Sequence, residues 1–300
     1  MSLRLGTTRK CLLALIVAVF VSGVSVASDL QMTVRAILKA PPPSKKPNPP
    51  CDGCEFVFWQ PQADAIQALQ VDAFPVLTEQ LTDREYSFPA AGTMLALDRS
   101  RAFSVLLKAA PTADMNAQDM IFDAFTHDCF ASACNPEWMA LAHTAALSVL
   151  KAESWQGDNL KAALYVVGLT GNEDDFPLLE KFNGKGNKYA SFVSEAALAK
   201  LGSQRDLENI KAKLQLPLPR HVGMMYAEEL RNSFVEAAFV GNKDSLPLLC
   251  PHLSDPNASW GDTVAIPAED AAAALEAISN KTFPLRFGDS KKWKLVCAAK

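Results

Sequence analysis

The strongest constraint on the fold is a nine-residue segment that occurs twice. GNEDDFPLL, at Gly171–Leu179, and GNKDSLPLL, at Gly241–Leu249, share six of nine residues. A looser copy, GSQRDLENI at Gly202–Ile210, keeps the glycine and the apolar residues five and eight positions later. The three glycines are 31 and 39 residues apart, a spacing that is typical of stacked helical hairpins. The chain is therefore expected to repeat a helix, a tight turn and a second helix.

The glycine of each copy follows an apolar helical stretch, where a left-handed residue commonly ends a helix. This position is held by Gly171, Gly202 and Gly241. Small residues three positions earlier allow neighbouring helices to approach closely, and these residues are Gly168, Ala199 and Ala238.

The second half of the segment carries the features of a helix start. Asp174 and Asp244 are expected to accept hydrogen bonds from backbone N–H groups that have no partner within the helix. Pro177 and Pro247 suit the first helical turn, where the missing N–H of proline costs nothing.

Helical periodicity extends over most of the chain, from about residue 62 onward. Apolar residues recur three and four positions apart, as in the stripe formed by Leu207, Ile210 and Leu214. Between Asp98 and Gly171 there is room for one more pair of helices, AQDMIFDAF and EWMALAHTAALSVLKA. These patterns predict an all-α chain with five or six helical hairpins between about 62 and 290.

Two of these units resemble a known repeat family. EAALAKLGSQRDLENIKAKL and VEAAFVGNKDSLPLLCPHL are similar to HEAT-like repeats of the bacterial exported type. AEDAAAALEAISNKTFPLRFGDSKKWKLV resembles the closing unit of such an array, with an aromatic C-terminal cap. The resemblance implies a right-handed α-solenoid, with an extended concave surface that usually binds other proteins.

The first 28 residues have the pattern of a secretory signal peptide. Arg4, Arg9 and Lys10 precede the apolar run Cys11–Val26, and small residues follow, with cleavage expected after Ala27 or Ser28. An uncleaved N-terminal anchor is the alternative. Residues 29–50 are expected to form an N-terminal segment and a proline-rich spacer, and residues 51–300 the repeat domain.

Six cysteines remain after the signal peptide, and an even number in an oxidising compartment favours disulfides. They are Cys51, Cys54, Cys129, Cys134, Cys250 and Cys297. Local pairing of 51 with 54, 129 with 134 and 250 with 297 is the simplest arrangement, although Cys51 and Cys54 could each pair with Cys129 or Cys134. A redox dithiol at Cys51 and Cys54, or a zinc site shared with Cys129, Cys134 and His127, are the functional alternatives.

We interpret the other candidate residues as structural, so the sequence assigns no catalytic, cofactor-binding or metal-binding residue. His143 lies in an apolar helix and is interpreted as a structural histidine, whereas His252 is expected at the surface. None of the four histidines, His127, His143, His221 and His252, is followed by glutamate, so the His-Glu pairs of HEAT-like di-iron hydroxylases are absent. Trp260, in a polar loop, is the candidate for an exposed contact.

Composition and export together limit the partner class. The chain without residues 1–28 has 26 Lys and Arg against 33 Asp and Glu, a net charge of −7, which disfavours nucleic acid and acidic membranes. The sequence therefore predicts a periplasmic or secreted, non-catalytic scaffold that binds an unidentified protein and stays off the membrane once the signal peptide is cleaved. The alternatives are a bilin-lyase-like enzyme, which the resemblance implies, and a thiol-disulfide oxidoreductase that uses Cys51 and Cys54.

Overall fold

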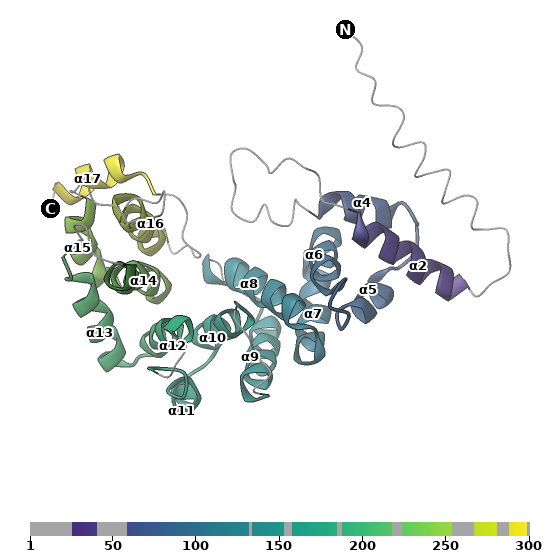
Figure 1. The fold of residues 1–300 in the computed structure, drawn as a ribbon, viewed down its shortest axis with the longest axis horizontal. Coiled ribbons are helices and arrows are strands. Elements are labelled where there is room, and N and C mark those ends of the chain that lie inside the picture. The colour runs from purple at the N-terminus through teal and green to yellow at the C-terminus, as the bar shows by residue number, and fades with distance from the viewer. Residues whose placement is uncertain are drawn as a thin grey trace, which may run out of the picture.

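A computed structural model describes residues 26–40, 59–131, 134–152, 158–184, 188–217, 224–253, 267–280 and 288–298 (Figure 1). These residues form helices and turns, and no described residue lies in a β-strand. The expectation of an all-α chain is confirmed for this part of the molecule.

The helices are short and numerous. The first half contains α2 (Val26–Lys39), α4 (Gln60–Gln67), α5 (Phe74–Gln80), α6 (Ser87–Leu97), α7 (Arg99–Ala109), η2 (Ala110–Thr112), α8 (Met115–Ala131) and α9 (Pro136–Lys151). The second half contains α10 (Asp158–Thr170), η3 (Glu173–Asp175), α11 (Phe176–Leu179), α12 (Lys188–Lys200), α13 (Gln204–Leu214), α14 (Met224–Val240), η4 (Lys243–Ser245), α15 (Leu246–Leu249), η5 (Cys250–Leu253), α16 (Pro267–Asn280) and α17 (Ser290–Ala298). The extra helix pair expected between Asp98 and Gly171 is α8 and α9.

Two layers of helices run along the molecule. In the inner layer α4, α6, α8, α10, α12, α14 and α16 pack in succession, each against the next. The outer layer consists of α5, α7, α9, α11, α13 and α15, which pack against the inner helices beside them. Figure 1 shows the layers following an arc, with the inner helices on its concave side.

The turns between inner and outer helices match the sequence segment in part. Gly202 (φ 111°) and Gly241 (φ 71°) are left-handed, as predicted. Gly171 is not among the residues with positive φ, so that prediction is wrong for the first copy. Glycine is needed there for space, because a Cβ atom would meet the carboxylate of Asp175 and lie 2.7 Å from the carbonyl oxygen of Val167.

Asn172 and Asn242, in place of Asp174 and Asp244, are the N-cap residues at these turns. The side chains of Asn172 and Asn242 accept hydrogen bonds from the backbone N–H groups of Asp174 and Asp244, each at 2.8 Å. The capping role predicted for Asp174 and Asp244 is therefore wrong. A 3₁₀ turn precedes each short helix, so the helical start lies two residues earlier than the sequence suggested.

Proline is placed as predicted at the start of both short outer helices. Pro177 lies in the first turn of α11 and Pro247 in the first turn of α15. Pro75 holds the same position in α5, within the related segment FPVL. Because an N–H in the first turn has no acceptor within its own helix, proline can stand there without the loss of a hydrogen bond.

The N-terminal helix belongs to the folded body. The sequence placed residues 29–50 outside the repeat domain, but Val34 and Leu38 of α2 are buried in the first core cluster. Arg35 donates hydrogen bonds to Gln80 Oε1 at 2.7 Å and to Asp83 Oδ2 at 3.1 Å. The amphipathic residues 29–39 thus cover the first end of the array, while residues 41–50 of the expected spacer lie outside the described residues.

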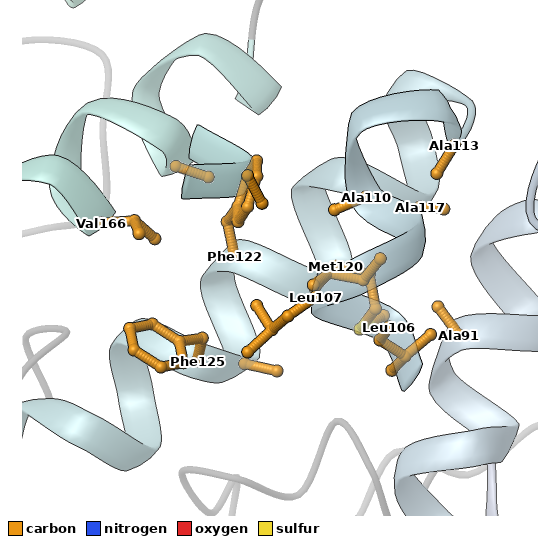
Figure 2. Close-up of a cluster of buried hydrophobic side chains, with 14 of the residues drawn as sticks. Ala91, Leu106, Leu107, Ala110, Ala113, Ala117, Met120, Phe122, Phe125 and Val166 are labelled. Carbon is orange, nitrogen blue, oxygen red and sulfur yellow. The ribbon is translucent and has the colours of Figure 1, made fainter. Parts of the chain in front are cut away.

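The core is divided into two clusters along the array. The first extends from α2 to α12 and the second from α12 to α17. Figure 2 shows the first cluster around α8, where Met120, Phe122 and Phe125 lie between residues of α6, α7 and α10. Alanines such as Ala91 and Ala117 leave room for these larger side chains. Half-buried Tyr165 packs against both clusters.

Gly168→Ala tests the close approach of α10 to α12 and α14. A Cβ atom at residue 168 would lie 2.9 Å from Cα of Ala197 and 2.9 Å from Cε1 of Phe239. Helix propensity alone would raise stability by up to about 1 kcal/mol for this change. We expect instead a loss of about 1–3 kcal/mol in the free energy of unfolding, because the backbone of α12 cannot move without disturbing its neighbours. Urea denaturation decides the sign, and a gain in stability would contradict the packing described here.

Candidate functional site

The most unusual chemical feature is a buried group of charges shared by α12, α13 and α14. Lys213, in the last turn of α13, donates hydrogen bonds from Nζ to Glu236 Oε1 at 3.0 Å and Oε2 at 3.2 Å. The same ammonium group contacts the carboxylate of Glu195 on α12. We call these three residues the Lys213 cluster. A single cation therefore joins carboxylates from two adjacent inner helices.

Local sequence explains how these charges come to lie inside the protein. Glu195 and Glu236 each begin an EAA triplet in an otherwise apolar helix, so both are carried into the core with their neighbours. Glu236 has no exposed surface and Glu195 is 7% exposed. The Lys213 side chain is 20% exposed, consistent with a long apolar stem that crosses the helix interface to deliver its charged end.

The electrostatics of the cluster follow from its burial. Burial raises the pKa of Glu236, the Lys213 ammonium group opposes this rise and the nearby Glu195 carboxylate adds to it, and the net result is a pKa of about 8. For Lys213, burial alone would lower the pKa, but the two carboxylates outweigh that effect and its pKa is raised. Lys213 therefore keeps its charge, and Glu236 holds a proton at neutral pH.

A buried carboxyl group with a raised pKa is a common general acid in enzymes. Such a group must also reach a substrate, because a general acid or base has to lie within hydrogen-bond distance of the reacting group. Glu236 is fully enclosed, with no surface to present. The geometry therefore indicates that the Lys213 cluster holds α12, α13 and α14 together.

Beside the cluster lies an aromatic group at the junction of the two core clusters. The ring of Phe239 lies 4.7 Å from that of Tyr165 and 5.8 Å from that of Phe130. Lys200 donates a hydrogen bond from Nζ to the carbonyl of Phe239 at 2.9 Å and lies 4.4 Å from the centre of the Phe130 ring. Burial raises the pKa of Tyr165, and the charges of Glu236 and Asp123 raise it further. This tyrosine therefore keeps its proton.

The histidines fall into three environments. His143 Nε2 lies 3.0 Å from Asp175 Oδ2, a partner that agrees with a structural interpretation. His252 is 4% exposed and its Nε2 lies 2.6 Å from the carbonyl oxygen of Leu214. The surface position predicted for His252 is wrong, because η5 folds this residue against the ring of Phe234. His127 contacts Asp128, which Arg99 also binds with two hydrogen bonds.

The described residues contain two disulfides, one between α8 and α9 and one near the C-terminal end. Cys129 and Cys134 are joined across the turn between inner helix α8 and outer helix α9. Cys250 and Cys297 join η5 to α17. These are two of the three pairs expected from local pairing. Cys51, Cys54, His221 and Trp260 lie outside the described residues, as do the signal-peptide positions up to residue 25.

Sequence reasoning missed the Lys213 cluster completely. A usable signal was present, since an acidic residue interrupts the apolar run in both SEAALA and VEAAFV. Among the described residues, no group of three or more histidine, cysteine, aspartate or glutamate side chains is arranged to hold a metal ion.

Comparison with known proteins gives no relative, because no family model, curated protein or solved structure matches this chain. None of the described helices combines the length and apolarity needed to cross a bilayer.

Proposed function

We propose that this chain is an exported, HEAT-like helical-repeat scaffold that binds a protein partner and has no catalytic activity of its own. In this proposal the hairpins form a right-handed α-solenoid of five or six units, and the partner lies along the inner layer. The observation that carries it is the regular packing of α4, α6, α8, α10, α12, α14 and α16, each against the next. Such stacking leaves one continuous surface whose residues come from many units.

The inner layer supplies side chains suited to a protein partner. Asp123 on α8 and Arg231 on α14 are exposed, and the half-buried rings of Tyr165 and Phe192 belong to the helices between them. Protein interfaces are enriched in aromatic residues, which contribute much of the binding energy, whereas charges at the edge guide association.

Two observations support export to the periplasm or the cell exterior. Disulfides persist in oxidising compartments, and the described residues contain two. The first 28 residues have the charge and hydropathy pattern of a cleaved signal peptide.

Site-specific photo-crosslinking in the exported fraction tests the binding surface. A benzophenone amino acid is placed at Asp123 or Arg231 in the inner layer, and in matched controls at Glu137 or Lys151 of the outer helix α9, all exposed. We expect one discrete crosslinked product from both inner positions and none from the outer ones. Equal crosslinking from the two layers, or none from either, would contradict a scaffold that binds through its inner layer.

A further inference from the structure

We propose that the Lys213 cluster is a pH-sensitive joint, in which a proton on Glu236 holds α12, α13 and α14 together and its loss loosens their packing. One ammonium group faces two carboxylates, so full ionisation would leave an excess negative charge in the interior. An uncompensated buried charge is strongly destabilising, and a buried carboxyl group takes up a proton in preference.

The groups around the cluster do not favour a second ionised carboxylate. Tyr165 on α10 is neutral, and Asp123 on α8 adds negative potential at that tyrosine. Lys200 on α12 is directed to the carbonyl groups of Phe239 and Val240 at the end of α14.

Two further cations on the packed helices have partners outside the cluster. Lys211 on α13 contacts Glu208 on the same helix, and Arg231 on α14 contacts Asp270 on α16. His252 on η5 lies against the carbonyl group of Leu214, and burial lowers its pKa. We therefore infer that a proton on Glu236 neutralises the excess negative charge. The raised pKa of Glu236, about 8, agrees with this inference.

The direction of the pH effect follows from this proton. Because the folded state raises the pKa of Glu236 from 4.5 to about 8, the folded state binds one more proton than the unfolded state between these values. The stability that this proton provides is complete below pH 4.5 and is lost as pH rises toward 8. His252 acts in the opposite sense, since its lowered pKa makes stability fall as pH drops below 6.5. Below pH 6.5 the two effects oppose each other, so the net loss of stability is expected above pH 6.5.

Glu236→Gln separates the contribution of this proton from all others, because glutamine stays neutral and can still accept a hydrogen bond from Lys213. Urea denaturation of the mature protein is followed between pH 5.5 and 9.5. Relative to E236Q, we expect the folded-to-unfolded ratio of the wild type to fall by up to about tenfold per pH unit until about pH 8. Glu208→Gln, an exposed change on α13, should keep the wild-type profile. Identical slopes in E236Q and the wild type would overturn the proposal.

Hydrogen exchange of the unmodified protein gives a second test that does not depend on the variant folding. Protection factors, corrected for the pH dependence of intrinsic exchange, are compared at pH 6 and pH 9. We expect protection to fall in α13 and α14 and to stay unchanged in α6 and α8, which belong to the other core cluster. A uniform fall along the chain, or none in α13 and α14, would show that no joint opens there.

Discussion

Replacing Lys213 with methionine will lower the free energy of unfolding by about 3 kcal/mol at pH 7, the lower end of the range for removal of one partner from a buried ion pair. Methionine fills much of the volume of the lysine stem but leaves Glu195 and Glu236 without their common cation. The negative charge that remains in the cluster then carries its full cost of burial. Urea denaturation followed by circular dichroism measures this loss.

Two control variants show whether charge or packing causes the effect. Lys211→Met, on the same helix, removes a cation that contacts Glu208, which lies at the surface, and should cost less than about 1 kcal/mol. Adding E195Q and E236Q to Lys213→Met removes the whole cluster, and we expect this triple variant to recover most of the lost stability. If the triple variant is as unstable as Lys213→Met alone, the loss comes from packing and the electrostatic account is wrong.

The corners of the array could be predicted because glycine and proline have narrow conformational preferences. Gly202, Gly241, Pro177 and Pro247 occupy the predicted positions, since few other residues tolerate a left-handed turn or suit a first helical turn so well. The capping residues could not be assigned in the same way. The two closely matching copies each offer asparagine and aspartate within three positions, and both side chains can cap a helix. In both copies a 3₁₀ turn starts directly after the asparagine, which makes this residue the cap, and the segment alone does not indicate that start.

The acidic residues in SEAALA and VEAAFV signal an unusual position, but the sequence does not show that Lys213 joins them. Inner helices are covered by neighbours on both sides and from the outer layer, so hydrophobic periodicity does not mark one exposed face on which charges would be expected. Glu236 could equally have faced solvent on the concave side. Its burial depends on where α13 ends, because only there can Lys213 reach it. His252 was misplaced for the same reason, as its burial depends on the position of Leu214.

The two described disulfides should differ in their effect on stability according to the length of chain that each encloses. Cys250 and Cys297 are 47 residues apart, whereas Cys129 and Cys134 are separated by five. If each bond acts by restricting the unfolded chain, its contribution grows with the logarithm of loop length. Replacing both cysteines by alanine should then cost about 4 kcal/mol for the 250–297 pair and about 2 kcal/mol for the 129–134 pair.

Comparison of the two double-alanine variants also shows how α17 is held. Without the disulfide, α17 keeps the hydrogen bond from Trp293 Nε1 to Glu276 Oε2, at 2.8 Å, and the ion pair between Lys292 and Glu276. If these contacts suffice, the C250A/C297A variant unfolds in one transition at a lower urea concentration, with the full loss of about 4 kcal/mol. If they do not, α17 detaches first, and Trp293 reports a separate early transition while the remaining chain unfolds close to the wild-type midpoint. An equal loss for both pairs would contradict the dependence on loop length, and it would place the stabilisation in the folded contacts around each bond.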